Sequence, residues 1–89
     1  MPERVRSSIG DDLELLLQAT ERVIKTQHAA RSALQRWMRV GFVKCGWLLN
    51  LMEERGIVGP ACGSSAREVL VPRDQLNATL DAIHAEAAA

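Results

Sequence analysis

The chain has 89 residues, and its 11 basic and 11 acidic side chains cancel to a net charge of zero. A chain of this length forms one domain that buries roughly 60–65% of its unfolded surface, which excludes a second domain and a deep enzymatic pocket. No apolar run is long enough to span a membrane and the N-terminus lacks the apolar core of a signal peptide, so we expect a cytoplasmic domain without membrane contact of its own.

The order of the charges along the chain is more informative than their sum. The window from Arg22 to Met52 contains six basic residues and no acidic one, and the acidic residues lie before and after it. This segregation predicts one electropositive side, for which a polyanion is the simplest partner. A solvated basic face without a partner is the alternative interpretation. The six cations are Arg22, Lys25, Arg31, Arg36, Arg39 and Lys44.

The titratable side chains show no spacing that is typical of catalysis or of metal binding. Cys45 and Cys62 are far apart, and neither belongs to a CxxC motif or has a histidine at ligand spacing. Cys45 falls on an apolar helix face and is expected in the core, whereas Cys62 lies in a Gly/Ser/Pro loop and should be exposed. We therefore expect no enzyme activity, no metal and no cofactor in this chain.

The first part of the chain predicts one helix. Residues 1–11 are polar and patternless, which indicates a disordered lead-in. Asp11 or Asp12 can cap a helix that extends to about Thr26, because apolar residues recur there at helical spacing. Residues 28–30 are too few for another helix and favour a short extended bridge.

A second helix is predicted to begin at Ser32, because Ser32 and Gln35 have the S-x-x-Q spacing of a capping box. The pattern breaks at Val40-Gly41, and a third helix starts at Gly41 or Phe42. Two helices joined by a tight turn that contains glycine predict a helix-turn-helix.

The third helix, which ends at Gly56, has two dissimilar sides at about 3.6 residues per turn. Large apolar groups left in water gain nothing from folding, so the side that carries Trp47 is expected to contact a partner. The alternative is a helix packed on both sides, inside the domain or at a subunit contact. The expected core side carries Phe42, Cys45, Leu48, Leu49 and Met52, with Leu51 at its border, and the other side carries Val43, Gly46, Trp47, Asn50 and Glu54.

A β-hairpin is predicted after the third helix. Ile57-Val58 and residues 67–71 read as short strands on either side of a Gly/Ser/Pro turn, and Pro72 closes the hairpin. A last helix should run from Gln75 to about Ala87.

These elements predict a mainly α fold with one small β-hairpin. We expect a winged helix-turn-helix of three helices and a wing over residues 12–72, with an added C-terminal helix and a frayed alanine tail over residues 73–89. In such folds the third helix commonly enters the major groove of DNA while the wing lies along the phosphates.

A set of residues at fixed spacing runs from the second helix to the end of the hairpin. It comprises Leu34-Gln35-Arg36, Arg39-Val40-Gly41-Phe42, Leu48, Met52-Glu53, Gly56-Ile57-Val58-Gly59-Pro60, Gly63, Arg67 and Val69-Leu70-Val71. This set resembles the γ domain that ends the FtsK/SpoIIIE family of DNA translocases, and the resemblance covers about Leu13 to Val71. In that family the module is a winged helix that recognises short, polar DNA sequences and so loads or orients a hexameric motor.

The resemblance implies that this chain binds double-stranded DNA sequence-specifically, beside other copies of itself on DNA repeats. The chain contains no G-x-x-x-x-G-K-[ST] motif, so the partner motor would lie on another stretch of polypeptide or another protein. The implied setting is chromosome segregation or conjugative plasmid transfer, and a parent translocase could associate the domain with a membrane.

Three positions depart from the family pattern. Where this chain has Val43, family members tend to carry Asn or Ala; where it has Trp47 they carry Arg, and where it has Asn50 an acidic residue. In the family these three positions read bases. The replacements imply a different DNA site, and they make the chain resemble the γ-like end of the actinobacterial TraB plasmid translocases more than a chromosomal FtsK. The implied base-reading residues are Val43, Lys44, Trp47 and Asn50, and the implied phosphate and wing contacts are Arg36, Arg39, Ser64, Ser65 and Arg67.

Two alternative functions stay open. A stand-alone winged-helix regulator would need a dimer interface, for which Leu76, Leu80 and Ile83 on the last helix are the only candidate. A winged helix that binds another protein would use Val43 and Trp47 as a hydrophobic hot spot. Salt dependence separates DNA binding from an apolar protein contact, because only the former weakens steeply with salt.

Overall fold

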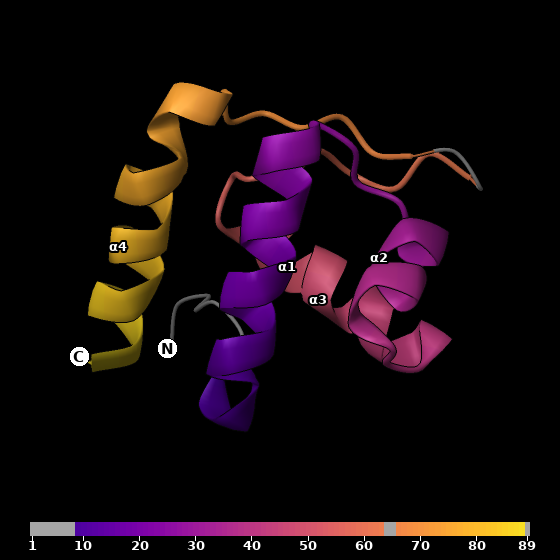
Figure 1. Cartoon of the computed structure of the whole chain (residues 1–89), viewed down its shortest axis with the longest axis horizontal. Coiled ribbons are helices and arrows are strands. Elements are labelled where there is room, and N and C mark those ends of the chain that lie inside the picture. The colour runs from indigo at the N-terminus through magenta and orange to yellow at the C-terminus, as the bar shows by residue number, and fades with distance from the viewer. Residues whose placement is uncertain (1–8, 64–65, 89) are drawn as a thin grey trace, which may run out of the picture.

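Four helices make up most of the structure, a computed structural model that describes residues 9–63 and 66–88. They are α1 (Leu13–Thr26), α2 (Arg31–Met38), α3 (Phe42–Glu54) and α4 (Leu76–Ala88), with 3-10 turns at Gly10–Asp12 and Arg73–Gln75. Helix α1 stands in the middle, with α4 along one side and the pair α2 and α3 on the other (Figure 1). The lead-in expected over residues 1–8 lies outside the described residues.

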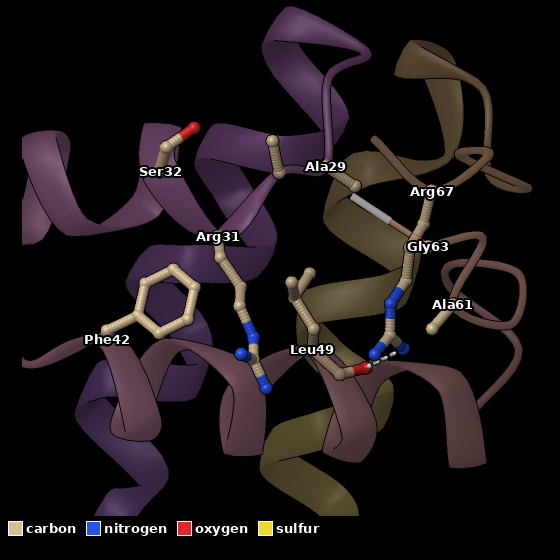
Figure 2. A pocket seen from close by; sticks show the side chains of 9 residues that line it. Ala29, Arg31, Ser32, Phe42, Leu49, Ala61, Gly63 and Arg67 are labelled. Atoms are coloured by element: carbon tan, nitrogen blue, oxygen red, sulfur yellow. Dashed lines mark hydrogen bonds between the residues drawn. The ribbon is translucent and has the colours of Figure 1, made fainter. Parts of the chain in front are cut away.

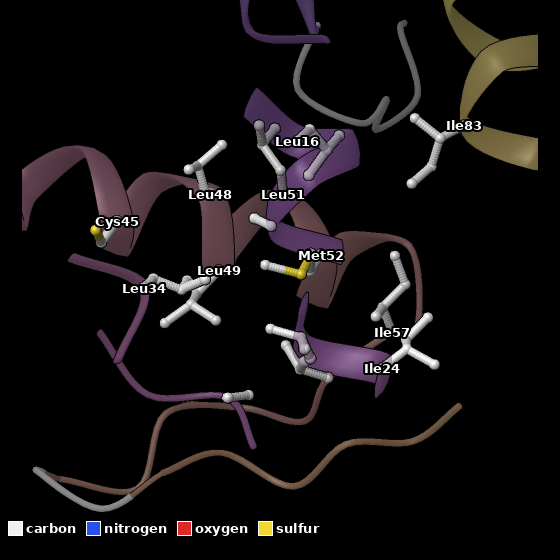
Figure 3. Close-up of a cluster of buried hydrophobic side chains, with 14 of the residues drawn as sticks. Leu16, Ile24, Leu34, Cys45, Leu48, Leu49, Leu51, Met52, Ile57 and Ile83 are labelled. Carbon is white, nitrogen blue, oxygen red and sulfur yellow. The ribbon is translucent and has the colours of Figure 1, made fainter. Parts of the chain in front are cut away.

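One hydrophobic core joins the four helices (Figure 3). Helix α1 contributes the side that the apolar spacing predicted, and its Leu16, Val23 and Ile24 are completely buried. Helix α4 contributes Ile83, and the chain just after α3 contributes Ile57. Because burying one such side chain is worth about 1.5–3 kcal/mol, this core is the main source of stability.

The end of the predicted lead-in is ordered, contrary to the sequence-based prediction for residues 9–11. Ile9 is 6% exposed and belongs to the core. Its carbonyl accepts a hydrogen bond from the Asp12 N–H at 3.0 Å, which closes the 3-10 turn before α1. Burial of the Ile9 side chain explains why the backbone is fixed one turn earlier than the polar sequence suggests.

Neither predicted side-chain cap forms. The Asp12 carboxylate makes no capping hydrogen bond because it accepts hydrogen bonds from two side chains of α3 instead. Helix α2 begins at Arg31, one residue before the predicted start, and its N-cap residue is Ala30. Ser32 therefore lies inside the first turn, where it cannot form the predicted capping box with Gln35.

The two helices of the predicted helix-turn-helix are present and are joined by residues 39–41. The left-handed residue of this turn is Arg39, with φ 57°, whereas Gly41 has φ −66°, which any residue can adopt. The Arg39 N–H donates to the Gln35 carbonyl at 2.9 Å and thereby ends α2. The turn therefore depends on an arginine in a conformation that glycine usually takes.

The β-hairpin predicted after α3 is not formed, since the described residues contain no strand. The two segments meet only in an isolated antiparallel bridge between Val58 and Val69, and a second bridge joins Ala29 to Arg67. The predicted first strand is only two or three residues long, and Pro60 then has no N–H with which to continue a ladder. Backbone pairing of the two described segments is therefore limited to two hydrogen bonds around the bridge between Val58 and Val69, from the Gly59 N–H to the Glu68 carbonyl at 2.8 Å and from the Leu70 N–H to the Ile57 carbonyl at 2.9 Å.

Helix α4 packs along α1 and runs to Ala88, so the alanine tail is helical as far as that residue. Ile83 is 2% exposed and Leu76 packs against the same core, which means that the face expected for a dimer contact is used inside the domain. An ion pair adds to this packing. Arg55, whose side chain is 4% exposed, donates to the two carboxylate oxygens of Glu86 at 3.0 and 2.5 Å.

Replacing Glu86 by Gln should destabilise the domain, because the buried Arg55 guanidinium would lose the nearer of its charged acceptors and keep Glu54 at 3.5 Å. We expect the free energy of unfolding to fall by roughly 1.5–3 kcal/mol in urea denaturation. Asp81→Asn, at an exposed position of the same helix, is the matched control and should change this energy by less than about 0.5 kcal/mol. Equal stabilities of the two variants would show that the ion pair does not hold α4.

Candidate nucleic-acid interface

The outward side of α3 exposes large apolar side chains. Val43 is 82% exposed, Phe42 49% and Trp47 38%. Together with Gly46 and the exposed Asn50, these residues form what we call the α3 outer face. Exposed apolar side chains add nothing to folding stability, so a cluster of them on one helix indicates a contact surface.

Two residues of the outer face differ from the helical pattern. Phe42, predicted in the core, is half exposed, whereas Gly46, predicted to point outward, is buried. Both differences involve Arg31, which extends from the start of α2 across the face (Figure 2). Its guanidinium carbon lies 4.5 Å from the centre of the Phe42 ring and covers Gly46. No periodicity or motif points to Arg31, because the contact is between two helices.

Asp12 binds two of the predicted base-reading side chains at once. One carboxylate oxygen accepts a hydrogen bond from Lys44 Nζ at 3.0 Å, and the other accepts one from Trp47 Nε1 at 3.1 Å. These charge-assisted contacts fix the Trp47 ring and partly neutralise Lys44. Sequence reasoning missed this role because it assigned Asp12 to a helix cap.

Arg67 does not extend along an exposed wing, as its predicted phosphate contact would require. Its side chain is only 9% exposed. The guanidinium donates to the Leu49 carbonyl at 3.4 Å (Figure 2). It also donates to Asn50 Oδ1 at 3.0 Å and to Glu53 at 3.2 Å. Arg67 therefore connects the segment after α3 to α3 itself and fixes the side chain of Asn50.

A groove of about 550 Å³ lies between the start of α2, α3 and the chain near Gly63. Arg31 and Arg67 line it from opposite ends, and Leu49 lies between them (Figure 2). Because the donors of Arg67 are occupied, Arg31 is the arginine of this groove that can bind an anion.

The cations of the Arg22–Met52 window differ in how far they are neutralised. Lys25 pairs with Glu21 at 2.8 Å, and this hydrogen bond and charge hold the pKa of the Glu21 carboxyl below its usual value. Arg36 and Arg39 are exposed and form no ion pair with any residue that the structure describes. They remain available to an external anion. Two further predicted contacts, Ser64 and Ser65, lie outside the described residues.

Apart from these contacts, the described residues carry few groups with chemistry of their own. No three His, Cys, Asp or Glu side chains among them lie close enough together to hold a metal ion. Cys45 is buried, which raises the pKa of its thiol, and Cys62 is exposed, as predicted. No helix between residues 9 and 88, with residues 64 and 65 set aside, is long and apolar enough to cross a bilayer.

Replacing Asp12 by Ala should release Trp47 and Lys44 together, because both lose their shared acceptor. In a Trp37→Phe background, where Trp47 is the only tryptophan, its fluorescence anisotropy should fall. The free energy of unfolding should also fall, by about 1–2 kcal/mol. Asp11→Ala, an adjacent exposed acid without a partner among the described residues, should change neither quantity. Unchanged anisotropy in Asp12→Ala would contradict the contact.

Known proteins contain segments similar to this sequence. Residues 10–72 match the family model described as the FtsK gamma domain. The chain is 54% identical over 86 residues to a protein of Streptomyces avermitilis named DNA translocase FtsK. It is 55% identical over 82 residues to one of that name in Mycobacterium tuberculosis, and 57% over 81 residues to one in Tropheryma whipplei. The matches cover 97%, 92% and 91% of this chain but only 10%, 10% and 11% of those proteins. By its sequence, therefore, this chain belongs to the FtsK γ domain family.

Proposed function

We propose that this chain is a helix-turn-helix module that binds double-stranded DNA sequence-specifically through the α3 outer face, with the bridged segments after α3 in the place of a wing. The proposal is supported chiefly by unpaired cations at the end of the helix that precedes α3. Arg36 and Arg39 lie exposed at the end of α2, directly before α3, and no described acid neutralises them. Phosphates flank the major groove on both sides, so cations beside a protruding helix match the charge pattern of duplex DNA.

In this arrangement the outer face meets the edges of the bases. Val43 and Trp47 offer apolar contact to thymine methyl groups, and Asn50 can pair with adenine N6 and N7. Asn50 Oδ1 accepts one hydrogen bond from Arg67 and keeps a second lone pair for adenine N6–H, while its amide N–H groups are free to donate to N7. Lys44 is less able to reach a guanine than the sequence suggests, because it is paired with Asp12.

The wider role rests on the family. The relatives compared above are named DNA translocases, and this chain spans about a tenth of their length. We propose that it loads or orients a translocase motor that lies elsewhere in a parent polypeptide, in chromosome segregation or in plasmid transfer. The closer likeness to TraB stays a prediction, because those relatives all bear the name FtsK. One such module buries only roughly 600–1,000 Å² on DNA, so tight binding needs neighbouring copies on adjacent repeats.

The exposed apolar area also favours a second candidate, a module that binds another protein. Phe42, Val43 and Trp47 are side chains of the kind that dominate protein interfaces. The cations beside them favour DNA, since an apolar protein contact does not need unpaired arginines around it. A stand-alone regulator is disfavoured, because the apolar face of α4 packs against the core instead of remaining free for a dimer.

The chain should bind duplex DNA with a steep dependence on salt. If about four phosphates are neutralised, the slope of log K against log salt should be near −4. Arg36→Ala or Arg39→Ala should weaken binding to all sequences alike and make the slope shallower by about 1. Lys25→Ala is the control and should leave the slope unchanged, because Glu21 already pairs with Lys25. A slope near zero would instead support the protein-binding candidate.

The DNA sequence that is selected should depend on the outer face. We expect the triple variant Val43→Ala, Trp47→Arg, Asn50→Asp to select a different motif from a random duplex pool than the parent chain selects. The introduced arginine can grip guanine O6 and N7, worth roughly 1–3 kcal/mol against the wrong base, and the introduced aspartate can accept from cytosine N4. If both chains return the same motif, the outer face does not read DNA.

A further inference from the structure

Arg31 has no part in the function proposed so far, yet its side chain crosses the α3 outer face. It is the first residue of α2 and extends to α3 between Phe42 and Leu49 (Figure 2). Gly46, which the guanidinium covers, lies one helical turn from Phe42 and one turn from Asn50. Arg31 therefore belongs to the same surface as the proposed base-reading residues.

Two features of α3 hold the Arg31 guanidinium in place. Its carbon lies 4.5 Å from the centre of the Phe42 ring, within the range of a cation–π contact. Gly46 leaves room beneath it, because a Cβ at that position would lie 2.6 Å from Arg31 Cζ and would overlap the group. The guanidinium thus rests in a notch that only a glycine provides.

The hydrogen-bond donors of this guanidinium are unused within the described chain. Arginine carries five N–H groups in a fixed fork, and those of Arg31 donate to no residue that the structure describes. Arg67, on the same groove, differs because its donors are occupied by Asn50, Glu53 and the Leu49 carbonyl. Arg31 is exposed, so its free donors are accessible to a ligand.

We propose that Arg31 is a specificity-determining residue that reads a guanine through its O6 and N7 atoms. The inference rests on the DNA-binding function proposed above. Guanine is the base whose major-groove edge offers two acceptors to the arginine fork. A guanidinium that is already positioned loses little conformational freedom on binding, which favours a directional contact over a diffuse attraction.

A phosphate also offers two acceptors, but the placement of the cations favours the guanine. Arg31 lies over Phe42 on the outer face itself, whereas Arg36 lies in the last turn of α2 and Arg39 at its C-terminal end. The cation of α3 itself, Lys44, is held by Asp12 at 3.0 Å. Among these cations, Arg31 is therefore the one that is held on the outer face and still has free donors.

The test measures binding of the chain to a duplex that carries the motif selected by the parent from a random pool. Each guanine of the motif is replaced in turn by 7-deazaguanine, which lacks only the N7 acceptor. At one position this should weaken binding of the parent about fivefold or more. The same replacement should have no effect on Arg31→Ala, which has no donor left for N7.

Gly46→Ala tests the notch without changing any charge. The added methyl group overlaps the Arg31 guanidinium and displaces it, while alanine is the better helix former, so the variant should fold and lose the 7-deazaguanine effect. Arg36→Ala is the matched control for loss of a cation. It should bind every duplex more weakly but keep the effect. Urea denaturation verifies that each variant is folded.

The outcomes separate this inference from the function on which it rests. If the parent chain does not bind duplex DNA, the proposed function fails and the inference with it. If the parent binds but Arg31→Ala responds to 7-deazaguanine as the parent does, DNA binding stands and the inference is overturned. A selected motif without guanine overturns it as well. The inference is also overturned if Arg31→Ala binds all duplex sequences more weakly to the same extent and its salt slope is shallower by about 1, because that result identifies a phosphate contact.

Discussion

The position of α3 depends on the burial of one of its sides against the other helices. Leu48, Leu51 and Met52 are completely buried, and both α1 and α2 pack against this helix. A helix that fixes one side in a core must present the opposite side to solvent. The packing of the inner side therefore directs Val43 and Trp47 toward solvent.

Three charged side chains from other parts of the chain then organise the outer face. Asp12 comes from the turn before α1, Arg31 from the start of α2 and Arg67 from the segment after α3. Each contacts α3 through hydrogen bonds or stacking. Ordering a flexible side chain on binding costs about 0.5–1.5 kcal/mol, so a face that is ordered beforehand can bind with less loss of entropy.

The same contacts decide which cations are left for a partner. Lys25 and Lys44 are paired with acids, and Arg67 is almost fully buried, whereas Arg36 and Arg39 stay unpaired within the described chain. A zero net charge is thus compatible with an electropositive side. In the proposed function, this distribution separates phosphate contacts, which supply affinity to any sequence, from the outer face, which supplies discrimination.

The sequence by itself determined the four helices, the break between α2 and α3, the buried Cys45 and the family, because apolar spacing and short motifs are local properties of the chain. Only the tertiary structure decided the role of Asp12, since a carboxylate that can cap its own helix binds the side chains of α3 once packing brings them within reach. The place of Arg31 over Phe42 and Gly46 was settled in the same way, by the approach of α2 to α3. Such contacts join residues far apart in sequence, and no local pattern encodes how two helices meet.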